Sequence, residues 1–115
     1  MNFADAVKSV LTLNYANFNG RASRSEYWWW ILFVIIVSIV LSVVDSMIGM
    51  QILGPIFSLA TLIPGIAVAI RRLHDIGRSG WWFLIVFTII GAFVLIYWFI
   101  QPSEPDNQYG PTPVA

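Results

Sequence analysis

Three long apolar runs without a single charged side chain constrain this 115-residue chain more than any other feature. They cover residues 27–44, 52–70 and 81–100 and are 18, 19 and 20 residues long. A helix rises about 1.5 Å per residue, so each run would span roughly 27–30 Å, close to the thickness of a hydrocarbon core. Because every peptide group inside lipid must find its partner within its own segment, the runs predict membrane helices.

Composition supports the same class of protein. The residues AVILMFWYC make up 58% of the chain, charged residues make up 10%, and the mean hydropathy is +0.77. A soluble domain has about 25% charged residues and could not bury so much apolar surface at this size. Six Lys and Arg residues balance six Asp and Glu residues, which argues against a nucleic-acid partner. With no cysteine, the chain cannot form disulfides or cysteine-based metal sites.

We therefore expect an all-α membrane protein that forms a single membrane domain with three transmembrane helices. The expected elements are an amphipathic interfacial helix at about 2–14, spans at about 24–47, 52–75 and 80–100, and a Pro-rich tail at 101–115. Trp81 and Trp82 open the third run, and Tyr97 and Trp98 close it. Such rings favour the membrane–water interface, so these aromatic pairs are predicted to lie at opposite interfaces.

The positions of the cations predict the orientation of these helices. All six precede the first span or lie between the second and third spans: Lys8, Arg21, Arg24, Arg71, Arg72 and Arg78. Cytoplasmic loops are enriched in Lys and Arg, so three spans place the N-terminus inside and the C-terminus outside. An even number of spans is expected to break this segregation of the cations.

Three residues within or beside the spans each allow two interpretations. Ser23 and Glu26 have the spacing of a capping box, but Glu26 could instead pair with an arginine of segment 71–78. Pro64 should kink the second span, either opening the backbone beside a pocket or forming a packing kink, and we favour the packing kink. Asp45 shares a helix face with two serines that could bond between helices, but we favour an ordinary terminus at the outer surface.

The candidate functional residues lie in two polar segments, 20–28 and 71–82, at the same predicted membrane surface. The candidates for binding a headgroup or a partner are Arg21, Arg24, Arg71, Arg72, His74 and Arg78. Two acids are expected to form ion pairs between the segments, Glu26 with Arg71 or Arg72 and Asp75 with Arg21 or Arg24. The alternative is that the cluster only sets topology and attracts anionic lipid nonspecifically.

Catalytic chemistry has weaker support than binding. His74 is the only histidine, so a centre built from several histidines cannot form, and we predict no catalytic residue, metal ligand or cofactor. Nearby serines lack the Gly-x-Ser-x-Gly pattern of a hydrolase, and no phosphate-binding or dinucleotide-binding motif occurs. We expect a non-enzymatic protein, and the remaining alternative is a membrane enzyme acting at segment 71–78.

Three motifs resemble a known family. They are Gly-Arg-Ala-Ser-Arg-Ser-Glu-Tyr-Trp at 20–28, Arg-Arg-Leu-His-Asp-x-x-Arg-Ser-x-Trp-Trp at 71–82, and Asn-x-Tyr-Gly-Pro-x-Pro at 107–113. Together they resemble the bacterial YhaH-like inner membrane proteins, the domain of unknown function 805 family, over nearly the whole chain. The resemblance implies a multi-pass protein of the bacterial inner membrane and brings no established catalytic residues. Family tails usually have a Gly-Thr-x-Gly turn where this chain has Ser103-Glu104-Pro105-Asp106, so no tail contact is carried over.

The function expected from these features is binding at the membrane surface. The cluster would bind lipid headgroups, anionic phospholipid among them, or a partner membrane protein, as in an accessory subunit. The alternative is a subunit of an oligomeric small-solute transporter or channel, since three helices are too few to enclose a pathway. Ser58, Thr61, Gly65 and Ala69 share a face that would allow close packing in a homo-oligomer. No charge lies at mid-membrane, where transporters commonly place one.

Overall fold

The computed structural model describes residues 1–113, in which the regular elements are helices. In chain order they are α1 (Phe3–Lys8), the π-helix η1 (Ser9–Leu13), α2 (Arg24–Ile48), α3 (Leu53–Asp75), the 3-10 helix η2 (Gly80–Phe87) and α4 (Ile89–Phe99). The last two residues of the tail predicted at 101–115 lie outside the described part of the chain.

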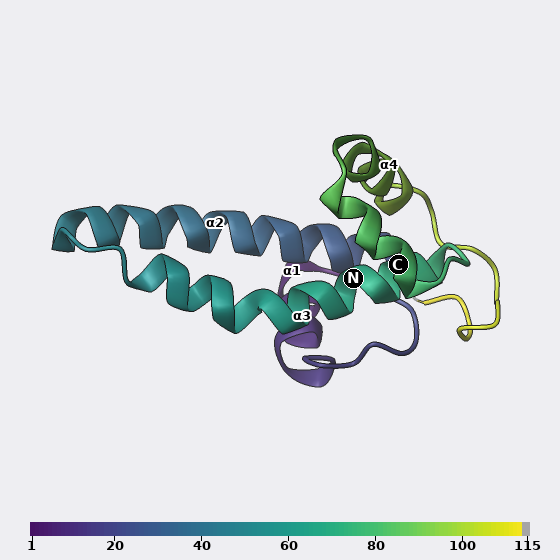
Figure 1. Ribbon diagram of the computed structural model, residues 1–115. Helices are drawn as coiled ribbons and strands as arrows, with labels where there is room; N and C mark the ends of the chain where they lie inside the picture. Colours follow the sequence, from purple (N-terminus) through teal and green to yellow (C-terminus); the bar gives the residue numbers. More distant parts are fainter. Residues whose placement is uncertain (114–115) are drawn as a thin grey trace.

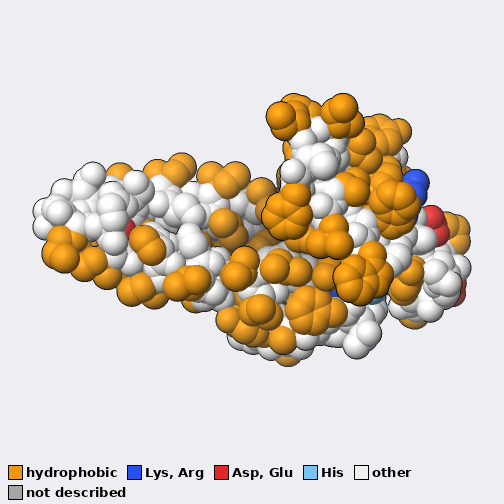
Figure 2. Space-filling model, in the orientation of Figure 1, with side chains coloured by type: hydrophobic (Ala, Val, Ile, Leu, Met, Phe, Trp, Pro, Cys, Tyr) orange, Lys and Arg blue, Asp and Glu red, His pale blue; other side chains and the backbone are white. Residues whose placement is uncertain are grey.

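A long antiparallel pair, the α2–α3 hairpin, extends well beyond the rest of the molecule (Figure 1). Its two helices are long and apolar enough to cross a membrane. The Ser23 hydroxyl accepts the backbone N–H of Glu26 at 3.1 Å and starts α2, and Gly49 ends it with a left-handed φ of 84°. Apolar side chains lie along the visible surface of this hairpin, interspersed with backbone and other side chains (Figure 2).

A buried carboxylate closes the far end of this hairpin. Asp45, in the last turn of α2, is 1% exposed and accepts the backbone N–H groups of Leu53 and Gly54, each at 2.9 Å. These donors lie in the first turn of α3 and have no partner within their own helix. The expectation that Asp45 is an ordinary outer terminus is therefore wrong, because its side chain caps the next helix and fixes the turn.

Pro64 leaves one backbone carbonyl in the middle of α3 without its helical partner. Proline has no N–H, so the carbonyl of Ala60, four residues earlier, loses its usual bond. The hydroxyl of Tyr15 donates to this carbonyl at 2.8 Å. The proline thus helps to dock the loop after η1 against α3, which agrees with the favoured interpretation of a packing feature.

The N-terminal segment packs its apolar face against the α2–α3 hairpin. The Asn2 side chain caps α1 by accepting the backbone N–H of Asp5 at 2.8 Å. Ala6 and Val10 are fully buried, and Val10 belongs to the same cluster as Trp30. The amphipathic segment is therefore helical, as expected, and it is fixed to the two long helices by packing.

The third apolar run is broken in the middle. Thr88 has an extended backbone, with φ −111° and ψ 149°, between η2 and α4. Its hydroxyl accepts the N–H of Gly91 at 2.9 Å and donates to the carbonyl of Ile85 at 2.8 Å. The two arms then fold back on each other, so that the rings of Trp82 and Trp98 meet edge to face at 5.7 Å. The predictions of one span at 80–100 and of aromatic pairs at opposite interfaces are wrong.

The arms of this η2–α4 hairpin, residues 80–99, are too short to cross a bilayer. Eight residues of 3-10 helix at about 2 Å each, and eleven residues of α-helix at about 1.5 Å each, both give roughly 16 Å. This is about half of a hydrocarbon core of ~30 Å. Hydropathy does not distinguish one full span from two half-length arms, and the cap at Thr88 decides between them.

The C-terminal tail returns to the end of the molecule that holds the N-terminal segment (Figure 1). Arg24 donates to the carbonyl of Ile100 at 3.1 Å, and Arg21 donates to the carbonyl of Gly110 at 2.9 Å. The predicted placement of the two termini on opposite sides is therefore wrong. Two crossings also keep the cations at one end, which corrects the expectation that an even number of spans would separate them.

This topology predicts a simple pattern of cysteine accessibility, since the chain has no native cysteine. Introduced at exposed sites, Asp5→Cys and Gln108→Cys should react with an impermeant maleimide from one side of the membrane, and Met47→Cys should react only from the other. All three should react in detergent. Labelling of Gln108→Cys together with Met47→Cys in intact vesicles would contradict the fold and restore the third span.

The tip of the η2–α4 hairpin predicts a strict requirement for glycine at position 91. A Cβ added there would overlap the carbonyl oxygen of Ile85 and the hydroxyl of Thr88. We expect Gly91→Ala to lower the free energy of unfolding in detergent by about 1–3 kcal/mol, as overpacking does. The control Ile90→Ala changes a neighbouring side chain that is 79% exposed and should cost less. Equal stability of Gly91→Ala and wild type would show that the tip of the hairpin has room for a Cβ at position 91.

Candidate functional site

The two polar segments predicted to hold functional residues meet where α2 begins and α3 ends. The backbone N–H of Ala22 donates to the carbonyl of Arg71 at 3.0 Å and joins the loop before α2 to α3. Around this contact lies a set of buried ionic side chains that we call the charged network: Arg21, Glu26, Arg71, Arg72 and Asp75. Each of these side chains is at most 5% exposed.

Asp75 lies at the centre of the charged network. Its Oδ1 accepts from Arg21 at 3.0 Å, and its Oδ2 accepts from Arg72 and from the Ser103 hydroxyl, both at 2.6 Å. The side chain is fully buried, and a buried carboxylate needs such partners to replace its lost water. Asp75 therefore ties together the loop before α2, the end of α3 and the C-terminal tail.

Glu26 forms the second ion pair of the charged network. Its Oε2 accepts from Arg71 Nη1 and from the Ser9 hydroxyl, both at 2.9 Å. Arg71 also donates through Nε to the carbonyl of Asn17 at 3.2 Å. The interpretation as an ion pair with an arginine of segment 71–78 holds for the Glu26 carboxylate, whereas only the Ser23 half of the capping box forms, through the backbone N–H of Glu26. This pair joins η1, α2 and α3.

Arg21 and Arg72 use their remaining N–H groups on backbone carbonyls. Arg21 donates to the carbonyls of Glu104, Pro105 and Gly110, and Arg72 donates to those of Phe99 and Gln101. The last carbonyls of a helix lack partners within it, so Arg72 completes the end of α4 from a neighbouring helix. These guanidinium groups are satisfied inside the protein and are not available to a headgroup.

Arg24 and Arg78 lie outside the charged network. Arg24 is exposed and donates to the carbonyl of Ile100. The guanidinium carbon of Arg78 lies 4.0 Å from the centre of the Trp98 ring, a cation–π geometry. These two arginines are the predicted binding residues that keep contact with the surroundings.

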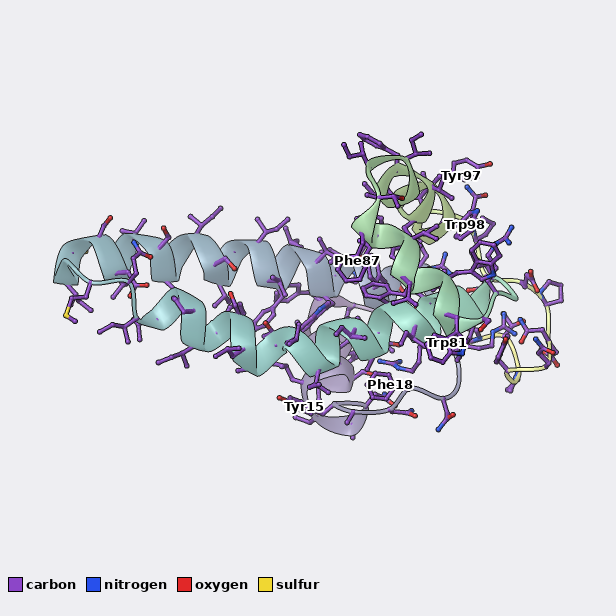
Figure 3. All side chains as sticks on the ribbon, in the orientation of Figure 1. Tyr15, Phe18, Trp81, Phe87, Tyr97 and Trp98 are labelled. Atoms are coloured by element: carbon purple, nitrogen blue, oxygen red, sulfur yellow. The ribbon has the colours of Figure 1, made fainter. Side chains whose placement is uncertain are left out.

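His74 faces an apolar cleft for which no local motif gives a signal. The cleft has a volume of about 490 Å³ and is lined by α3 (Ile66, Ile70, His74), by residues 79–87 (Ser79, Gly80, Trp81, Phe83, Leu84, Phe87), by Phe18 and by Tyr109. In Figure 3, Phe87 is labelled above α3, and Phe18 and Trp81 are labelled below it. Only the folded chain brings these segments together, so sequence periodicity could not reveal the cleft.

The tail supplies contacts that sequence reasoning missed. The Tyr109 ring stacks on His74 with centroids 4.0 Å apart and planes 3° from parallel. The Asn107 amide donates to the carbonyl of His74 at 3.1 Å. The available signal was the Asn-x-Tyr-Gly-Pro-x-Pro motif, whose matched residues include both of these. Segment 103–106, where the chain departs from the family pattern, still contacts the charged network, because the Ser103 hydroxyl donates to Asp75.

The charged network holds the loop before α2, the end of α3 and the C-terminal tail together. Its carboxylates and guanidinium groups form buried ion pairs, and Nη2 of Arg71 is the one buried side-chain nitrogen or oxygen of residues 1–113 without a hydrogen-bond partner. Within residues 1–113, no three His, Asp or Glu side chains come together in a way that could hold a metal ion.

The tail and the charged network both fall inside a match to a known protein family. Residues 15–111 match the family model described as "Protein of unknown function (DUF805)". The chain belongs to the DUF805 family. It is 42% identical over 108 residues to inner membrane protein YhaH of Escherichia coli (strain K12), a match that covers 87% of this chain and 89% of YhaH.

Two further relatives occur in the same organism. Inner membrane protein YhaI is 41% identical over 104 residues, covering 87% of this chain and 88% of YhaI, and the uncharacterized protein YiiR is 36% identical over 90 residues, covering 76% and 60%. No solved structure matches the chain. The predicted family and the inner membrane location are confirmed.

The pair between Glu26 and Arg71 predicts a strong energetic coupling in this DUF805 protein. Glu26→Gln should lower the free energy of unfolding by about 3–5 kcal/mol, because it leaves a buried charge without its partner, and Arg71→Gln should do the same. The double variant should lose less than the sum of the two. The control Arg24→Gln, at an exposed site, should stay within about 0.5 kcal/mol of wild type. Additive losses in denaturant unfolding would show that the pair is not coupled.

Proposed function

We propose that this protein is a non-enzymatic accessory protein of the inner membrane that binds anionic phospholipid headgroups at the cytoplasmic surface. The observation that carries the proposal is that the cations gather at one end of the α2–α3 hairpin. The positive-inside rule assigns that end to the cytoplasm. Both the N-terminal segment and the tail then lie inside the cell.

Three of the six cations are left to meet headgroups. Arg21, Arg71 and Arg72 are the partners in the salt bridges of residues 1–113 and are buried. We call the other three the rim cations: Lys8, Arg24 and Arg78. Lys8 and Arg24 are exposed, and Arg78 is half-buried against Trp98. Each cation near an anionic membrane surface contributes ~1 kcal/mol of attraction.

Apolar elements on the same end of the molecule support contact with the inner leaflet. The η2–α4 hairpin is uncharged and carries large exposed side chains, among them Trp81 at 80% and Phe87 at 83%. Apolar side chains also dominate its visible surface (Figure 2). Tryptophan favours the headgroup region, so this hairpin would hold the neighbouring rim cations at headgroup level.

Removing the rim cations should weaken binding of anionic lipid. In native mass spectrometry from mild detergent, we expect wild type to be a monomer carrying phosphatidylglycerol. Lys8→Gln/Arg24→Gln/Arg78→Gln should retain at least about tenfold less, since three attractions of ~1 kcal/mol are lost. The matched control Asp106→Asn removes an exposed charge of the opposite sign and should not weaken retention.

Two other results would redirect the proposal. A closed, lipid-poor oligomer that the triple variant leaves unchanged would contradict lipid binding and favour a subunit of a small-solute transporter or channel. Phosphatidylglycerol retention that is unchanged in the triple variant would show that the rim cations do not bind the headgroup.

A further inference from the structure

We infer that the cleft beside His74 binds one membrane glycerophospholipid, with an acyl chain along α3 and η2 and a headgroup that donates a hydrogen bond to His74. The inference deepens the proposed function by naming the lipid class and a specific site. The site is separate from the rim cations, because none of Lys8, Arg24 and Arg78 lines the cleft.

The size and the walls of the cleft suit a hydrocarbon chain. Its volume of about 490 Å³ lies within the roughly 300–1,000 Å³ of ligand-binding pockets. Ile66 and Ile70 of α3 form one wall, and Phe83 and Phe87 of η2 form another. Arginine, lysine and carboxylate side chains are absent from this lining. A chain lying here would contact apolar side chains along its length.

The cleft opens onto the surface that faces lipid, which identifies the occupant. Trp81, Leu84 and Phe87 line it and are 80%, 54% and 83% exposed, and they belong to the uncharged η2–α4 hairpin. In Figure 3 the labelled Phe18, Trp81 and Phe87 lie around the C-terminal half of α3. Water does not fill apolar cavities well, whereas lipid chains are the surrounding medium at this surface. A lipid chain therefore occupies the cleft in preference to a soluble ligand.

His74 gives the cleft a polar end with a defined hydrogen-bonding role. Its Nδ1 lies 2.9 Å from the carbonyl oxygen of Gly20, which can only accept, so Nδ1 carries the proton. In its neutral form the ring then presents Nε2 as an acceptor, and Nε2 has no hydrogen-bond partner within residues 1–113. Stacking on Tyr109 fixes the plane of the ring. The headgroup that fits must donate a hydrogen bond.

Ser79 adds a donor beside this acceptor. Its Oγ accepts the backbone N–H of Trp81 at 3.3 Å, which leaves the hydroxyl proton to donate to a phosphate or ester oxygen. The primary ammonium of phosphatidylethanolamine provides the N–H donor that His74 requires. The trimethylated ammonium of phosphatidylcholine has no N–H and cannot meet it.

The first test compares these lipids on the unmodified protein. Native mass spectrometry with matched acyl chains should show one tightly held phosphatidylethanolamine, retained at least about tenfold better than phosphatidylcholine. His74→Phe keeps a ring to stack on Tyr109 but lacks the acceptor, so it should remove this preference. Equal retention of the two lipids by wild type would overturn the inference. This comparison uses only the unmodified protein, so it does not depend on the folding of a variant.

The second test fills the cleft. Ile66→Trp should displace phosphatidylethanolamine, whereas Ile63→Trp, one turn earlier on α3 and outside the lining, should retain it. Unchanged retention by Ile66→Trp would overturn the inference. Phosphatidylethanolamine is zwitterionic, so its retention should survive loss of the rim cations. Failure of the cleft and failure of the rim are thereby distinguished, since phosphatidylethanolamine reports on the cleft and phosphatidylglycerol reports on the rim cations.

Discussion

A carboxylate buried at a membrane surface needs enough donors to replace the water it has lost, and Asp75 obtains them only when three distant parts of the chain meet. Arg21 comes from the loop before α2, Arg72 comes from α3, which also holds Asp75, and Ser103 comes from the tail. The two arginines need further acceptors, and tail carbonyls supply them. The fold of this whole end of the molecule follows from satisfying these few groups, because an unpaired charge there would cost several kcal/mol.

This requirement also explains why the third apolar run turns back. The Phe99 carbonyl accepts from Trp28 Nε1 at 2.9 Å and from Arg72 Nε at 3.2 Å, so the end of α4 is held beside the start of α2. A continuous third span would carry that end, and the tail after it, to the opposite side of the membrane. The charged network would then lack Ser103 and its carbonyl acceptors. Thr88 makes the return possible by capping α4 within an uncharged segment.

Much of the architecture could be predicted from the sequence, and the failures have physical causes. Length and hydropathy identify the two helices that are long and apolar enough to cross a membrane, and complementary charges on two polar segments anticipate the contact of Glu26 with Arg71. The turn at Thr88 was missed because twenty apolar residues satisfy the length criterion whether they run straight or fold back. The role of Asp45 was missed because its partners lie across a turn, beyond the spacing of a local cap. The cleft depends on segments that meet only in the folded chain.

The order in which the chain is synthesised gives the tail a further significance. The α2–α3 hairpin is complete once Asp75 has been made, yet its buried charges still lack Ser103 and the carbonyls that follow. Until those residues have been synthesised, the end of the molecule that holds the charged network lacks part of the hydrogen-bond partners of its ionised groups. A chain that stops before Ser103 would leave Asp75 and Arg21 without hydrogen-bond partners that they have in the folded protein.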